Sequence, residues 1–188
     1  MSKINKLIFQ PPGLDIVINN LLFYNPIAII LYGSYGRDEG SLYTDSKGLQ
    51  KTYNDYDILL ILDKKLPDNE IESLKEKLLE KIDIRWIDIS QLTKIELTKL
   101  KPSIFNYDLK YASKVMYGDK NILDLISHID ASKLPLEEGN ILFRTRMWTF
   151  LGSLNIDGFN KTLSGDKSRF FRNQMAKAIL SIVDICLL

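Results

Sequence analysis

The chain has 188 residues, of which 45% are hydrophobic and 26% are charged, and its formal net charge is +1. This composition is typical of one soluble domain with a real core, or of a domain with a helical appendage, and it excludes an extensively disordered chain. The balanced charge does not favour bulk binding to nucleic acid or to an anionic membrane. A single cysteine, Cys186, and a single histidine, His128, exclude a disulfide framework and a Cys/His metal cluster.

The first predicted elements are a helix and a buried strand. Met1–Leu7 lacks a long apolar stretch, and no run approaches the ~18 apolar residues of a spanning helix, so we expect a cytoplasmic protein. Apolar residues at helical spacing predict a helix over Leu14–Phe23. The β-rich run Ile27–Tyr32 predicts a buried strand that ends where Gly33 permits a tight turn.

The turn after this strand has the residues of an anion-binding site. Ser34 is a good N-cap, so its hydroxyl and the amides behind it are expected to face outward, where a phosphate is stabilised. Arg37 either contacts that phosphate or is a solvated charge that pairs with Asp38 and Glu39. The Gly, Ser, Thr, Asp and Lys content of residues 35–54 predicts a flexible flap, a lid or a substrate loop.

Two carboxylates stand at the start of the next β-rich run. Asp55 and Asp57 are two residues apart and precede the apolar Ile58–Leu62, so in a strand they point to the same face. Like charges so close repel unless a cation lies between them. Oxygen ligands without Cys or His nearby favour Mg²⁺, or Mn²⁺, over zinc. The pair therefore predicts a metal site for phosphoryl or nucleotidyl transfer.

The second half of the chain is mostly helical. We predict an amphipathic helix over Asp68–Glu80 and an alternating strand over Lys81–Ile89, in which Asp83 and Asp88 point to opposite faces. A helical pattern over Leu92–Ala112 breaks at Lys101-Pro102, and Lys114–Tyr117 has the pattern of an edge strand. Further long helices are predicted over Leu136–Leu154 and Lys167–Leu188, joined by a loop around Gly158 and Gly165.

These elements predict an α/β (α+β) fold with a small mixed β-sheet and helices packed on it. We place the catalytic core at residues 1–119 and a helical C-terminal region at residues 120–188. The aromatic residues Trp86, Trp148, Phe143 and Phe150 are expected to serve packing, since that is the usual role of such side chains.

The combined motif resembles that of the polymerase-β-like nucleotidyltransferase superfamily. Its signature is an apolar strand, Gly-Ser at a helix start, and Asp-apolar-Asp opening the next strand; here these are Gly33-Ser34 and Asp55-Tyr56-Asp57. The longer stretches Tyr32–Ser41 and Asn54–Asp57 are similar to a bacterial branch of that superfamily. The resemblance implies the nucleotidyltransferase fold, a nucleoside triphosphate as donor, and Mg²⁺-dependent transfer of a nucleoside monophosphate to an acceptor hydroxyl with release of pyrophosphate.

The resemblance also implies a third acid and a lysine. We prefer Asp83 as the third acid, which would act as a general base or third metal ligand, because it lies early in its predicted strand between two isoleucines. Asp88 lies two residues before Ser90, near a predicted helix start, where a capping role explains it. Lys177 matches a lysine that reaches the nucleotide phosphates from the helix after the core, although Asp184 is an alternative partner. The implied nucleotide-binding residues are Gly33, Ser34, Arg37 and Lys177.

Two other functions compete with this interpretation. A metal-dependent glycosyltransferase also uses Asp-x-Asp, but places it after its hydrophobic strand, whereas here Ile58–Leu62 follows the acids. The second is a nucleotide-binding regulatory protein without turnover, or an antitoxin-type nucleotidyltransferase acting on a partner protein. The acceptor is open between an antibiotic, a protein side chain, a nucleic-acid end and a second nucleotide. The C-terminal helices are a candidate homodimer interface.

Overall fold

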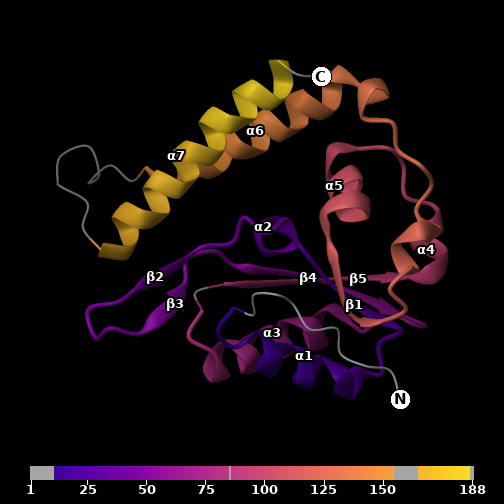
Figure 1. Cartoon of the computed structure of the whole chain (residues 1–188), viewed down its shortest axis with the longest axis horizontal. Helices are drawn as coiled ribbons and strands as arrows, with labels where there is room; N and C mark the ends of the chain where they lie inside the picture. Colours follow the sequence, from indigo (N-terminus) through magenta and orange to yellow (C-terminus); the bar gives the residue numbers. More distant parts are fainter. Residues whose placement is uncertain (1–10, 85, 155–164, 187–188) are drawn as a thin grey trace. The chain divides into compact units, whose positions relative to one another are not determined.

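The computed structural model describes residues 11–84, 86–154 and 165–186 (Figure 1). Contacts divide the chain into two compact units: the residues up to Lys101 together with Phe105–His128, and Pro102–Ile104 together with the residues from Ile129 onward. The division proposed from the sequence at Asp119 falls inside the first unit. Within the described ranges, every helix is too short or too polar to cross a membrane.

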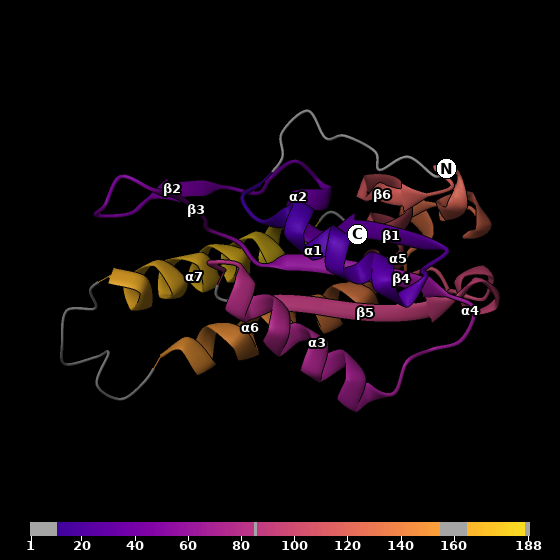
Figure 2. The same cartoon turned by 90° about the horizontal axis from the view of Figure 1, so that it is seen from below.

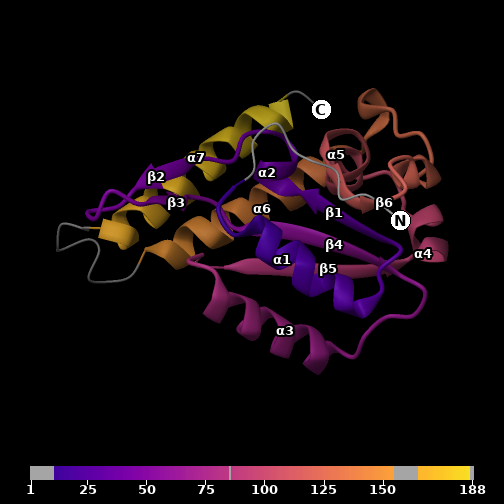
Figure 3. The ribbon, with the colours of Figure 1, turned by 60° about the horizontal axis from the view of Figure 1, so that its bottom comes forward.

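A mixed four-stranded sheet is the centre of the first unit (Figure 3). The strand order is β5 (Ile87–Thr93), β4 (Tyr56–Leu62), β1 (Ala28–Tyr32) and β6 (Lys114–Gly118). β1 runs antiparallel to β4 and β6, while β4 and β5 are parallel. The predicted mixed sheet is confirmed, and β6 lies at its edge as expected.

Two helices cover one face of this sheet, as Figures 1 and 2 show. They are α1 (Leu14–Leu21), which continues into the short η1 (Leu22–Tyr24), and α3 (Asp68–Lys81). Alternate residues of each strand point toward them, so β4 buries its even-numbered side chains, from Tyr56 to Leu62, against both helices. After β5 the chain forms the short helices α4 (Lys94–Thr98), α5 (Ile104–Ala112) and η2 (Ile122–Leu125), and η3 (Ala131–Lys133) follows in the second unit.

The predicted flap is a β-hairpin. β2 (Leu42–Thr44) and β3 (Gln50–Thr52) form a separate antiparallel sheet. Asp45 closes the turn, because its Oδ1 accepts hydrogen bonds from the amides of Lys47 at 2.8 Å and Leu49 at 3.0 Å. The polar residues that predicted a flexible loop therefore include those that form the turn between β2 and β3.

The strand predicted over residues 81–89 is displaced toward the C-terminus. α3 continues through Lys81, and β5 begins only at Ile87 and runs to Thr93. Asp88 is therefore a strand residue and not a helix cap; the cap of α4 is Thr93, which forms a capping box with Glu96. The predicted start of the strand is wrong, because the pairing with β4 begins only at Ile87.

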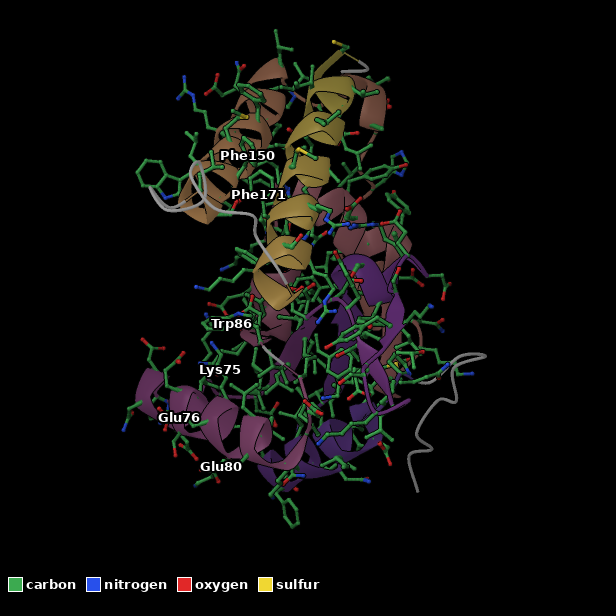
Figure 4. All side chains as sticks on the ribbon, turned by 90° about the vertical axis from the view of Figure 1, so that its left-hand side faces the viewer. Lys75, Glu76, Glu80, Trp86, Phe150 and Phe171 are labelled. Atoms are coloured by element: carbon green, nitrogen blue, oxygen red, sulfur yellow. The ribbon has the colours of Figure 1, made fainter. Side chains whose placement is uncertain are left out.

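The second unit contains two long helices, α6 (Leu136–Ser153) and α7 (Gly165–Cys186), which lie side by side (Figure 1). Phe150 and Phe171 meet between them, with ring centroids 5.6 Å apart (Figure 4). The loop around Gly158 lies outside the described residues, and Gly165 begins α7. The expectation that both tryptophans are core residues is wrong, since Trp86 is 61% exposed and Trp148 is 79% exposed.

Candidate functional site

Two acids lie side by side at one end of the parallel strand pair. In the β4–β5 register Asp57 is the partner of Asp88, so the two side chains point to the same face of the sheet. This face is opposite to the one covered by α1 and α3, because the neighbouring residues Ile58 and Ile89 point into that core. Both aspartates are partly exposed, so neither charge is removed from water.

Gly33 lies directly against the Asp57 carboxylate. A Cβ atom built on Gly33 would be 1.9 Å from Asp57 Oδ2, a distance that no pair of heavy atoms tolerates without bonding. Gly33 also has a φ of +65°, in the left-handed region that glycine adopts without strain. The glycine of the predicted phosphate turn therefore keeps open the space that the Asp57 carboxylate occupies.

Tyr32 connects the two acids from the third strand. It is the antiparallel partner of Asp57, and its hydroxyl donates to Asp88 Oδ2 at 3.2 Å and shares a hydrogen bond with Ser90 Oγ at 3.3 Å. Burial raises the pKa of Tyr32, and the charges of Asp88 and Asp57 raise it further, so the phenol keeps its proton and remains a donor. Tyr32 thereby orients the Asp88 carboxylate.

Lys75 of α3 approaches the same carboxylate from the edge of the sheet. Its ammonium lies 3.8 Å from Asp88 Oδ1 and 2.9 Å from Glu72 Oε1. In Figure 4 Lys75 lies on the side of α3 nearest Trp86, whereas Glu76 and Glu80 lie farther away from it. The Lys75 side chain is only 17% exposed, so this cation is held near Asp88 and partly offsets the negative charge of the acidic pair.

Asp55 and Ser34, which belong to the predicted motif, are close in sequence to Asp57 and Gly33 but have different surroundings. Asp55 lies one residue before β4 and is partly exposed. Its charge contributes, after burial, to raising the pKa of Tyr35 to about 12, which places it near that hydroxyl. Ser34 is the second residue of the four-residue α2 (Gly33–Gly36), whose N-cap is Tyr32, so the prediction that Ser34 is the N-cap is wrong.

The cations near the glycine turn are already paired with carboxylates. Arg37 donates to Glu39 at 2.8 Å and to Asp108 of α5 at 2.9 Å, and these contacts outweigh burial and raise its pKa. Lys114 of β6 pairs with Asp38 and also donates to the Tyr35 carbonyl at 3.5 Å. Arg37 thus forms the expected ion pair with the neighbouring Glu39, and its contact with a phosphate stays a prediction.

Asp83 is separate from the acidic pair, and Lys177 belongs to the second unit. Asp83 precedes β5, is 75% exposed, and forms a 2.6 Å ion pair with Lys51 of the hairpin. The strand register that favoured Asp83 over Asp88 is therefore wrong, although the role of either acid is still a prediction. Lys177 belongs to α7 in the second unit and is partly buried there. Its reach to a nucleotide also stays a prediction.

Sequence reasoning missed Tyr32 and Lys75. Tyr32 was detectable, because it is the last residue of an apolar strand that ends at Gly33, and strand alternation places it on a definite face. Lys75 carried no such signal. It is one of several charged residues on an amphipathic helix, and only the packing of α3 beside β5 brings it to Asp88.

The donor chemistry of the acidic pair fits a hard divalent cation. Among the described residues, no three His, Cys, Asp or Glu side chains are close enough to hold a metal ion together. Asp57 and Asp88 nevertheless offer carboxylate oxygens on one face, and Gly33 leaves room beside Asp57. Mg²⁺ commonly takes only one or two protein carboxylates and completes its shell with phosphate oxygens and water. The residues present suit that mode of binding.

No protein-family description and no curated protein matches this sequence. A solved structure described as "Crystal structure of the toxin-antitoxin with AMP-PNP" aligns with 59% of this chain and with 77% of its own, at 19% sequence identity and a TM-score of 0.40. Similarity at this level does not carry an activity or a ligand from one protein to the other.

Proposed function

We propose that this chain is a metal-dependent nucleotidyltransferase. It would transfer a nucleoside monophosphate from a nucleoside triphosphate to an acceptor hydroxyl and release pyrophosphate. The observation that carries the proposal is the contact of Gly33 with the Asp57 carboxylate, beside Asp88 in the neighbouring strand. A glycine turn and two carboxylates lie together there, and this arrangement supports a site for a metal ion and a nucleotide phosphate.

Each residue has a distinct part in this proposal. Asp57 would hold Mg²⁺ or Mn²⁺ with help from Asp55, Asp88 would lie beside the ion as the general base, and the ion would neutralise charge on the triphosphate oxygens. Gly33 and Ser34 would approach the phosphates through their backbone amides, and Arg37 and Lys177 are proposed as further phosphate contacts. Tyr32 would keep the Asp88 carboxylate in one orientation through the 3.2 Å hydrogen bond.

The transfer step follows from the position of Asp88. The acceptor hydroxyl oxygen forms a bond to the α-phosphorus, and the bond from that phosphorus to the bridging oxygen of the β-phosphate breaks, so pyrophosphate leaves with the electron pair. Asp88 accepts the hydroxyl proton as general base. Tyr32 stays protonated because its pKa is raised, and thus does not compete for that proton.

Nucleotide binding without turnover is the second candidate. The observation that favours it is the absence of a preassembled three-ligand cluster among the described residues, together with the Lys75 ammonium 3.8 Å from Asp88. This ammonium is already held at the acid that the catalytic proposal uses as general base. A protein of this kind would bind a triphosphate and release no pyrophosphate.

The test compares Asp57→Asn with Asp83→Asn, which makes the same change at an exposed acid outside the sheet. With Mg²⁺ and each of the common nucleoside triphosphates, we measure binding by calorimetry and pyrophosphate release in the presence of cell extract as a source of acceptor. Asp57→Asn should lose binding and release by at least ~10-fold, since one charge-assisted ligand is removed. Asp83→Asn should retain both.

Each outcome has a definite meaning. Binding without pyrophosphate release by the parent protein would favour the non-catalytic candidate. No binding by the parent, or equal binding by Asp57→Asn and the parent, would contradict the proposed site. The apo form of Asp57→Asn should unfold at the same temperature as the parent or slightly higher, because removing one of two neighbouring like charges relieves repulsion.

A further inference from the structure

An exposed aromatic side chain lies beside the acidic pair. Phe105 of α5 is 55% exposed, and its ring meets the ring of Tyr32, with centroids 5.6 Å apart and planes at 84°. Tyr32 is the antiparallel partner of Asp57, so its side chain points to the face of the sheet that carries the acidic pair. Figures 1 and 2 show α5 on that face, opposite to α1 and α3. A single residue, Tyr32, therefore connects Phe105 to the candidate site.

The contact with Tyr32 covers only part of the Phe105 ring. In a perpendicular pair, the edge of one ring lies against the face of the other. If Phe105 presents its edge, both of its faces are free of Tyr32, and if it presents one face, the opposite face is free. The exposure of Phe105 agrees with either arrangement. Phe105 thus offers at least one aromatic face that Tyr32 does not cover.

α5 fixes the position of this ring relative to the glycine turn. Asp108 follows Phe105 by one helical turn, on the same side of α5, and accepts a hydrogen bond from Arg37 at 2.9 Å. Gly36 of α2 lies so close to α5 that a Cβ atom built on it would be 3.2 Å from the Ala112 carbonyl oxygen. The Phe105 ring is therefore carried by a helix that contacts the end of the turn beginning at Gly33.

We propose that Phe105 is the platform on which the base of the nucleoside triphosphate stacks. The inference rests on the proposed function, in which the triphosphate lies at Gly33 and Asp57. A ribose separates the base of a nucleotide from its phosphates, and in this site one tyrosine separates the aromatic face from the acids. The Tyr32 hydroxyl donates to Asp88, while the Tyr32 ring meets Phe105.

Stacking gives the site a way to recognise a nucleotide by more than its phosphates. An aromatic face accepts any base, because every base has a π-face, and each stacked base adds to the affinity. A bare polyphosphate offers the same phosphate groups to the metal ion and the glycine turn, but it has no base. Phe105 therefore favours a nucleoside triphosphate over an inorganic polyphosphate.

The test compares ATP with inorganic tripolyphosphate, which has three phosphates and no base. Calorimetry of the full chain with Mg²⁺ gives the affinity for each ligand. Phe105→Leu keeps an apolar side chain against Tyr32 but removes the aromatic face, so it should weaken ATP binding at least ~5-fold and leave tripolyphosphate binding unchanged. Phe23→Leu is the matched control and should change neither affinity, because Phe23 is 81% exposed and belongs to η1, which continues α1 on the other face of the sheet.

A second variant reports on the stacking directly. Phe105→Trp retains an aromatic face and should bind ATP at least as tightly as the parent protein does. Its fluorescence, after subtraction of the parent signal from Trp86 and Trp148, should be quenched by ATP and not by tripolyphosphate, because only ATP places a base on the new indole.

The outcomes separate this inference from the proposed function. A parent protein that binds neither ATP nor tripolyphosphate would contradict both. If the parent binds ATP, the inference alone is overturned by an unchanged ATP affinity in Phe105→Leu, by an equal loss of affinity for both ligands in that variant, or by a Phe105→Trp signal that ATP does not alter.

Discussion

At the scale of single residues, the site depends on an atom that is missing. Gly33 has no Cβ, and the Asp57 carboxylate occupies the space where one would be. Gly33 is often interpreted in such motifs as a residue that lets the chain turn, and its φ of +65° agrees with that role. Its second role, room for a carboxylate from the adjacent strand, is visible only when β1 and β4 are paired.

Gly33→Ala and Gly48→Ala separate these two roles. Gly48 has a φ of +79° in the hairpin turn, and nothing lies within 4 Å of a Cβ built there. Gly48→Ala should therefore lower the free energy of unfolding by only the ~1–2 kcal/mol of the left-handed conformation. Gly33→Ala should cost more than that, because it adds the collision with Asp57, and should also displace the carboxylate.

The measurement is urea denaturation of both variants, with calorimetry of Mg²⁺ and triphosphate binding. We expect Gly33→Ala to lose binding and Gly48→Ala to bind as the parent does. Equal destabilisation by the two substitutions, together with retained binding in Gly33→Ala, would show that Asp57 moves freely and that Gly33 serves only the turn.

At the scale of elements, the sequence predicted most of what is local. The helices over residues 14–21 and 68–81 have apolar residues at helical spacing, and the strands over residues 28–32 and 56–62 are short, nearly continuous apolar runs. Both signals arise from the side chains of the element itself. The start of β5 was not predictable in this way. Isoleucines stand at positions 82, 84, 87 and 89, so the alternation changes phase between Ile84 and Ile87. Two short alternations of opposite phase follow each other, and the parallel pairing with β4 shows that the second belongs to β5 and makes Asp88 the partner of Asp57.

The consequence for catalysis is tested by Asp88→Asn, with Asp83→Asn as its control. If Asp88 is the general base, the substitution should lower turnover at least ~100-fold while triphosphate affinity changes little, since a base acts on the acceptor and not on the donor. Steady-state kinetics and calorimetry give the two quantities. A parallel loss of affinity and turnover would make Asp88 a metal ligand, and a loss confined to Asp83→Asn would make Asp83 the general base.

At the scale of the whole molecule, three buried tyrosines link stability to alkaline pH. Burial raises the pKa of Tyr35 to about 12, and it also raises the pKa values of Tyr32 and Tyr56. In the unfolded chain a tyrosine loses its proton near pH 10, while the folded protein retains it. Their contribution to stability is therefore complete below pH 10 and is lost progressively as the pH rises from 10 through 12.

Urea denaturation between pH 8 and pH 11.5 should show this loss, with a slope of about 1.4 kcal/mol per pH unit for each tyrosine above pH 10. Tyr32→Phe keeps the buried ring and its edge contact with Phe105, so it should remove the share of one tyrosine from the slope. A slope that is the same in Tyr32→Phe and the parent would mean that Tyr32 ionises normally in the folded protein.

The parallel pairing of β4 and β5 has a consequence for the order in which the protein is built. Asp57 and Asp88 are separated along the chain by the whole of α3, whereas Asp57 and its antiparallel partner Tyr32 are separated by α2 and the β2–β3 hairpin. A contact across the α3 crossover closes a loop, and closing that loop costs conformational entropy. The β1–β4 pair, with Gly33 against Asp57, does not require this closure, so we expect affinity for a divalent cation to appear in a refolding chain only after β5 has joined the sheet.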